Sequence, residues 1–148
     1  MKRFLPAIAV ALVAVGVLAI SAARAGGSAE APGDVLGPGP VTVRLTIHHS
    51  RFDQERVKVR PGTTVTFVVD NQDPIGHELI VGDADVHRRH ENGTEPAHAP
   101  RPGEVTVPAL ATETTTFDFP AIGPAVQYAC HLPGHLKFGM SGFVEVVA

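Results

Sequence analysis

The chain has 148 residues, which suits one domain, and only one cysteine, which excludes an internal disulfide. It carries 12 basic and 15 acidic residues; without residues 1–25, which hold three basic and no acidic residues, the balance is 9 to 15, a net charge of about −6. An acidic surface argues against nucleic acid as a partner, and an unpaired thiol in an oxidising compartment is expected to be buried or occupied.

Residues 1–25 have the pattern of an export signal. Two basic residues precede an uncharged apolar run from Phe4 to Ile20, and a small-residue cleavage pattern ends at Ala25. An uncleaved signal anchor is the alternative, because the stretch from Phe4 to Ala23 is close to the roughly 20 residues that a membrane helix needs. We therefore expect an exported protein of the periplasm, cell envelope or extracellular space, which is tethered to a membrane only if this segment is retained.

The next residues, 26–40, are rich in Gly, Pro and Ala and predict a flexible linker. From residue 41 onward, apolar and polar residues alternate with a period of two, as in half-buried strands. Gly/Pro turns separate about eight expected strands, at 41–48, 57–59, 63–70, 77–82, 104–108, 112–120, 125–130 and 142–148. With no convincing helix among them, residues 41–148 predict an all-β sandwich or barrel, and their length suits a sandwich with a single core.

One polar segment, residues 83–103, interrupts this rhythm. It carries His87, His90 and His98 among acidic residues and prolines. A loop of this length in so small a domain is often functional or mobile. We expect a solvated polar loop, and a second, weaker site for Cu(II) or Zn(II) on these histidines is the alternative.

Three metal-binding residue types follow one another near the end of the sequence. Cys130 ends a predicted strand, and His135 and Met140 follow in the turn-rich stretch HLPGHLKFGM. This loop can fold back so that the three side chains face one point, and His77, at the start of another strand, can supply a second imidazole. Two histidines and a cysteine in a plane, with a weak axial methionine, describe a blue-copper electron-transfer site.

The chain resembles the cupredoxins, the plastocyanin- and azurin-like small copper proteins. The resemblance covers about residues 41–148 and rests on the stretches FDQERVKVRPGTTVTFVVDNQD, GHELIV and YACHLPGHLKFGMSGFVEV. It implies a two-sheet Greek-key β-sandwich and one type 1 copper ion, with the ligand roles on His77, Cys130, His135 and Met140. The pattern is especially similar to exported bacterial cupredoxins associated with copper tolerance or respiratory chains.

Two residues beside the expected ligands need separate attention. Glu78 stands where many family members have an asparagine that braces the cysteine-bearing loop; a carboxylate there would stabilise Cu(II) if it points inward. His131 directly follows Cys130, and histidines that flank this cysteine bind further copper ions in multicopper oxidases. Here the preceding residue is Ala129, so we expect His131 to be a partly exposed histidine rather than a metal ligand.

These observations predict a mononuclear type 1 copper protein that carries single electrons between transient redox partners, as a monomer and not as an enzyme. In the family, the edge of the imidazole at His135 is the electron's exit, and Phe138, Pro133 and Pro74 would form a small apolar docking face around it. The alternative is a copper-binding tolerance protein that also uses the histidines of residues 83–103. A third reading, a subunit of a copper oxidase or nitrite reductase, needs a second copper site at a subunit boundary.

Overall fold

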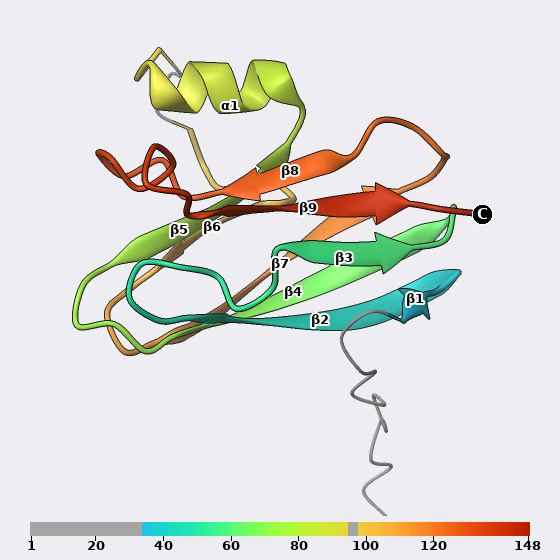
Figure 1. The fold of residues 1–148 in the computed structure, drawn as a ribbon, viewed down its shortest axis with the longest axis horizontal. Helices are drawn as coiled ribbons and strands as arrows, with labels where there is room; N and C mark the ends of the chain where they lie inside the picture. The colour runs from blue at the N-terminus through green and yellow to red at the C-terminus, as the bar shows by residue number, and fades with distance from the viewer. Residues whose placement is uncertain (1–33, 95–97) are drawn as a thin grey trace, which may run out of the picture.

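The computed structural model describes residues 34–94 and 98–148, which form two facing β-sheets with one helix outside them (Figure 1). The described chain contains nine strands, so the expected all-β fold is confirmed. The elements are β1 (Val35–Leu36), β2 (Gly39–Ile47), β3 (Arg56–Val59), β4 (Thr63–Asn71), β5 (His77–Gly82), α1 (Ala84–Glu91), β6 (Glu104–Val107), β7 (Thr112–Phe119), β8 (Val126–Ala129) and β9 (Ser141–Val146).

The two sheets contain six and three strands. The larger sheet has the order β1-β3-β9-β8-β5-β6, and the smaller sheet has the order β2-β4-β7. β9 runs parallel to β3 and antiparallel to β8, and β5 runs antiparallel to both β8 and β6. The last strand of the domain, β9, therefore lies in the interior of the larger sheet, between β3 and β8, which precede it in the sequence.

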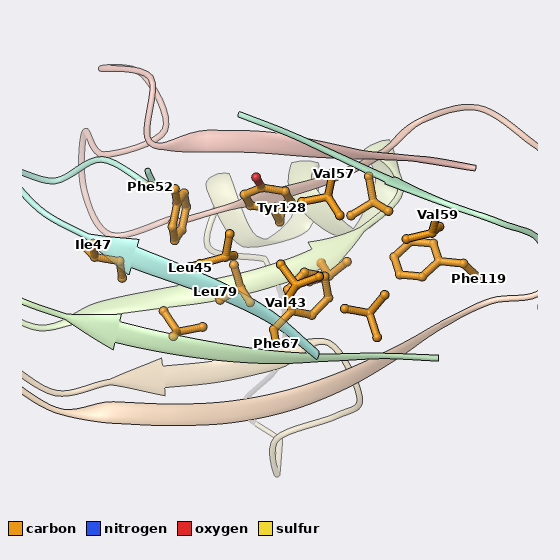
Figure 2. Packing of buried hydrophobic residues seen from close by; sticks show 14 of the residues in the cluster. Val43, Leu45, Ile47, Phe52, Val57, Val59, Phe67, Leu79, Phe119 and Tyr128 are labelled. Carbon is orange, nitrogen blue, oxygen red and sulfur yellow. The ribbon is translucent and has the colours of Figure 1, made fainter. Parts of the chain in front are cut away.

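Alternating burial along the strands builds the core between the sheets. In β4 every second residue is buried, so Phe67 faces the core and its neighbours do not. Tyr128 of β8 lies 5.4 Å from Phe52 in an edge-to-face arrangement and 6.3 Å from Phe67, between ring centroids. Figure 2 shows these rings among aliphatic side chains from both sheets. Each fully buried Val, Leu or Phe side chain stabilises the fold by roughly 1.5–3 kcal/mol.

The expectation that the domain has no helix is wrong for part of the segment 83–103, because α1 occupies its first half. The Asp83 carboxylate caps the helix by accepting hydrogen bonds from the amides of Asp85 and Val86, both at 2.9 Å. Gly82 lets the helix approach β5, since a Cβ there would lie 2.7 Å from the Cβ of Val86. The Asp83 cap and the close approach at Gly82 therefore support α1, although it lacks the apolar stripe from which a helix is predicted in a sequence.

The sandwich includes residues before residue 41. Val35 pairs with Lys58 and Leu36 pairs with Val59, so β1 and the first residues of β2 belong to the sandwich. The rest of the expected linker, 26–33, and the expected export signal, 1–25, lie outside the described residues. No helix in the described part of the chain is both long and apolar enough to cross a membrane.

Candidate metal centre

Strand pairing brings the expected ligands to one end of the larger sheet. His77 is the first residue of β5, Cys130 directly follows β8, and Met140 directly precedes β9. β8 lies between the other two strands, and its last residue, Ala129, pairs with Ile80 on one side and with β9 on the other. The loop between β8 and β9 therefore closes over the start of β5 (Figure 1).

Three donor atoms converge at this point with the spacing of metal ligands. One donor atom each from His77, Cys130 and His135 lies within 4.8 Å of the others. Nδ1 of His77 is 3.2 Å from Nδ1 of His135, which is 3.3 Å from Sγ of Cys130. Bonds of about 2.0–2.1 Å from one ion would place two nitrogen ligands roughly 3.3–3.6 Å apart. The three residues therefore fit a single ion with little movement.

Backbone hydrogen bonds within the loop fix the same residues. The amide of His135 donates to the carbonyl of Leu132 at 2.9 Å, the amide of Met140 to the carbonyl of His135 at 3.0 Å, and the amide of Cys130 to the carbonyl of Met140 at 3.2 Å. Gly134, with φ of 87°, supplies the left-handed turn between them. Met140 is fully buried, and with His77, Cys130 and His135 it forms a site of the type 1 copper kind.

Asp73, in the turn before β5, orients the first histidine. Its carboxylate accepts hydrogen bonds from Nε2 of His77 at 2.9 Å and from the amides of His49 and Ser50, both at 2.7 Å. An ionised carboxylate only accepts, so Nε2 of His77 carries the proton and its Nδ1 presents a lone pair to His135 and the cysteine. The sequence analysis missed Asp73; its signal was an acidic residue in a turn four positions before the histidine.

The protonation of this pair follows from its surroundings. Burial acts to raise the pKa of Asp73, but the amides of Ser50 and His49 and the imidazole of His77 together hold that pKa below its usual value. Burial lowers the pKa of His77, assisted by His135 and opposed by Asp73. The geometry therefore favours a neutral imidazole beside a carboxylate, which is the form that binds metal.

The chemistry of the cysteine also fits a copper ion. Cys130 is fully buried, and burial raises the pKa of its thiol even though the amides of Leu132 and Glu78 donate to it. A thiolate in this position needs a positive partner, which a metal ion provides. A soft thiolate and thioether combined with two imidazoles is the donor set that suits copper in both of its common oxidation states.

Glu78 points toward the cysteine-bearing segment. Its Oε1 accepts a hydrogen bond at 2.8 Å from the amide of His131, so the carboxylate braces the peptide that follows Cys130. Asparagine was the residue that the cupredoxin resemblance led us to expect in this bracing role. Glu78 is not in the converging group of donor atoms.

His131 turns away from the converging donor atoms and joins the histidines of α1. Its Nε2 lies 2.8 Å from Nδ1 of His87, whose Nε2 lies 3.1 Å from the carbonyl of Gln127. The rings of His131 and His90 stack with centroids 5.6 Å apart. Burial, with the nearby imidazoles of His87 and His90, lowers the pKa of His131 to about 4. Like His135, it is half-buried.

The candidate histidines of residues 83–103 divide between two places. His87 is buried beneath α1 and contacts His131, whereas His90 and His98 lie close to Glu104, with donor atoms of these three within 4.8 Å of one another. Sequence reasoning missed Glu104 because it lies at the start of β6 rather than among the histidines. Its only signal was an acidic residue that directly follows the histidine-rich segment.

Proteins with sequences similar to this chain are described as copper proteins. The family described as copper binding proteins of the plastocyanin/azurin family matches residues 41–147. A Rubrivivax gelatinosus relative named copper-resistant cuproprotein CopI is 34% identical over 119 residues, covering 78% of this chain and 71% of the relative. A Pseudomonas aeruginosa protein of the same name is 24% identical over 183 residues, covering 98% of this chain and 97% of the relative.

Solved structures with the same fold include auracyanins. Auracyanin A from Chloroflexus aurantiacus, titled a "blue" copper protein, has a TM-score of 0.58 and 24% identity, covering 74% of this chain and 100% of its own. Reduced auracyanin from Roseiflexus castenholzii has a TM-score of 0.59 and 20% identity, covering 76% and 98%. At this level of identity, the likeness supports the assignment of the two-sheet sandwich.

Proposed function

Because the chain belongs to the plastocyanin/azurin family of copper-binding proteins, we propose that it is an exported type 1 copper protein that takes part in copper tolerance. One observation carries the site: donor atoms of His77, Cys130 and His135 converge within 4.8 Å, next to the buried Met140. The tolerance role is supported by two relatives that bear the name copper-resistant cuproprotein. Neither name describes an enzyme.

The proposed ligands would hold the ion in a rigid and largely dry environment. His77, Cys130 and Met140 are buried, and His135 is half-buried, so His135 offers the site's contact with solvent. When bound, copper supplies a one-electron couple between Cu(I) and Cu(II). Asp73 keeps a proton on Nε2 of His77, which leaves Nδ1 free to bind.

A Cu(II) titration tests the assignment of the site. We expect an intense thiolate-to-copper absorption band that saturates after one equivalent, because a single cysteine sulfur is available. Cys130→Ser should abolish the band, and Met140→Leu should keep it with altered energy, because the thioether is the weak ligand. A band of unchanged intensity in Cys130→Ser would refute the proposed ligand set.

The tolerance role needs a separate test in cells. A copper-sensitive bacterial host that exports the wild-type chain should grow at higher copper concentrations than the same host with an empty vector. Cys130→Ser, expressed to the same level, should give no such advantage. If wild type and variant protect equally, the type 1 site is not the source of tolerance, even where the absorption band shows that it binds copper.

Single-electron transfer is the second candidate, favoured by the surface beside His135. Phe138 follows that histidine by one turn and is 74% exposed, and an exposed apolar side chain at the accessible edge of a metal site suits brief docking. Phe138→Asp should slow electron self-exchange between the oxidised and reduced protein, measured by NMR line broadening, and leave copper affinity unchanged. An unchanged exchange rate would argue against this face as the electron's exit.

A further inference from the structure

We propose that His90, His98 and Glu104 form a second metal-binding site, for a divalent ion of the Cu(II) or Zn(II) class. His90 lies in the last turn of α1, His98 lies in the segment that leads to β6, and Glu104 is the first residue of that strand. None of the three belongs to the type 1 donor set. The proposal therefore stands or falls independently of the copper-tolerance function.

The distances around the carboxylate of Glu104 are close to those of a metal site. Nε2 of His90 lies 3.7 Å from Oε1 of Glu104, and Nδ1 of His98 lies 3.6 Å from Oε2. The carboxylate thus presents one oxygen to each imidazole. Two ligands of a tetrahedral zinc ion are roughly 3.3 Å apart, given bonds of about 2.0–2.1 Å. A contraction of a few tenths of an ångström would bring the atoms to ligand spacing.

An independent observation points to a missing partner at this place. Nε2 of His90 is buried and has no hydrogen-bond partner among residues 34–94 and 98–148, and a buried polar atom without a partner is destabilising. A metal ion bound to this nitrogen would remove this destabilisation. Nδ1 of His98 donates to the carbonyl of Ala99 at 2.8 Å, so its imidazole would exchange that bond for the metal.

The surroundings combine partial burial with access. The side chains of His90 and Glu104 are 16% and 11% exposed, and that of His98 is 21% exposed. A hydrogen bond from the amide of Arg101 to Oε2 of Glu104 at 3.2 Å orients the carboxylate. Ligands with restricted motion lose less entropy when an ion binds.

Two of the three ligands come from elements that are anchored to β5. α1 is capped by Asp83 and packs across Gly82, and β6 pairs with β5 through the register of Ile80 with Glu104. The relative positions of His90 and Glu104 are therefore set by the fold rather than by the ion. This arrangement is what a selective site requires and a solvated histidine run lacks.

The donor set decides which ions fit. Two neutral imidazoles and one carboxylate supply a single negative charge and no sulfur. This combination suits Zn(II) and Cu(II), whereas Cu(I) prefers thiolate and thioether ligands. The second site would therefore take the oxidised form of copper or zinc, and its copper would lack the intense colour of the cysteine site.

The test is a Cu(II) titration of the full chain, followed by electron paramagnetic resonance and by the visible spectrum. We expect a second equivalent with a type 2 signal that adds nothing to the thiolate band. His98→Ala and Glu104→Gln should each lose that equivalent and keep the band, which also shows that they fold. His48→Ala, which removes an exposed histidine outside the group, should keep both equivalents.

Zinc provides a second arm, and two outcomes would overturn the proposal. Protein loaded with one equivalent of copper should bind one Zn(II) in calorimetry, and His98→Ala and Glu104→Gln should not. Saturation of the wild type at one equivalent of Cu(II) without zinc uptake, or a second equivalent that survives both substitutions, would refute the site. Loss of only the thiolate band in Cys130→Ser would leave it standing, so failure of the type 1 assignment is distinguishable.

Discussion

Asp73 sets the orientation of His77 and ties down the turn at His49 and Ser50. In Asp73→Asn, a single amide oxygen would replace two carboxylate oxygens as the acceptor for these three N–H donors. The new NH2 group is itself a donor, so it would face other N–H groups without forming a hydrogen bond with them. We expect copper affinity to fall about 10- to 100-fold, as for other groups that orient a metal-binding histidine. The free energy of unfolding of the copper-free protein should fall by about 1–3 kcal/mol.

Copper affinity can be measured by competition with a chelator of known strength, and stability by urea unfolding. Asp118→Asn is the matched control, because the Asp118 carboxylate lies on β7 and accepts from the Thr64 hydroxyl at an exposed position. The control should change neither quantity appreciably. Unchanged copper affinity in Asp73→Asn would mean that loop packing alone orients His77.

The low pKa of His131, about 4, makes the copper-free protein sensitive to acid. An unfolded histidine has a pKa near 6.5, so between about pH 6.5 and 4 the unfolded chain binds a proton that the folded chain does not. Stability therefore falls as the pH falls through this window. Allowing for the partial exposure of His131, we expect it to contribute a loss of about 1–2 kcal/mol.

Urea unfolding of copper-free wild type and His131→Gln at several pH values between 7 and 4 measures this effect. Glutamine does not titrate, so the variant should lose less stability on acidification than the wild type. The hydrogen bond to the Glu78 carboxylate is donated by the backbone amide of residue 131, so it remains in the variant. Parallel stability curves for the two proteins would contradict the prediction.

The residues of the type 1 copper-like site could be predicted from the sequence, whereas Asp73, which orients His77, and Glu104 of the proposed second site could not. One short segment contains Cys130, His135 and Met140, so their spacing alone indicates a common metal site. Asp73 and Glu104 reach their partners only through a turn and a strand pairing, neither of which leaves a local pattern. Glu78 could be placed beside the site, but the direction of its side chain depends on the position of β8.

At the scale of elements, Gly142 leaves room for the Tyr128 ring where β9 pairs with β8. It pairs with Tyr128 in the register of the two strands, and a Cβ at this position would overlap the tyrosine ring. The ring is fully buried, and its hydroxyl donates to the carbonyl of Gln54. Gly142→Ala should therefore lower the free energy of unfolding by about 1–3 kcal/mol, the usual cost of overpacking.

Thermal unfolding of the copper-free protein measures this cost. Gly123→Ala is the matched control, because a Cβ there would meet nothing within 4 Å, and it should be close to neutral. Copper affinity should also fall in Gly142→Ala, since β9 begins directly after Met140. A fully stable Gly142→Ala protein would show that the tyrosine ring can move aside without loss.

The strands and the helix differ in how visible they are in the sequence. Period-two alternation reveals most strands because one face of each is buried in the core. α1 carries few apolar residues and buries His87, so no apolar stripe marks it. Asp83 followed closely by Asp85 was the helix-start signal that was present, and on its own it also occurs in polar loops.

At the scale of the whole molecule, bound copper should stabilise the fold, because it links segments that are distant in the sequence. Its proposed ligands lie at the start of β5 and in the loop that joins β8 to β9, so the complete ligand set exists only in the folded state. Copper at about 1,000 times its dissociation constant should raise the free energy of unfolding by about 4 kcal/mol. A chelator should reverse the gain, and Cys130→Ser should show less of it.

Thermal unfolding with and without copper, at fixed protein concentration, is the measurement. Binding of copper to cysteine and histidine in the unfolded chain would reduce the gain without abolishing it. Identical melting temperatures with and without copper in the wild type would mean that the ligands do not form a single site in the folded protein.

The interior position of β9 also determines when, during synthesis, the larger sheet and the ligand set can be completed. While a chain is being synthesised, β3 and β8 emerge before the strand that separates them, so both leave unpaired edges that invite association with other chains. Cys130 has emerged by then, but Met140 has not. The complete ligand set therefore exists only after residue 140 has been synthesised, and a chain that stalls before it would expose two unpaired strand edges beside an unpaired thiol.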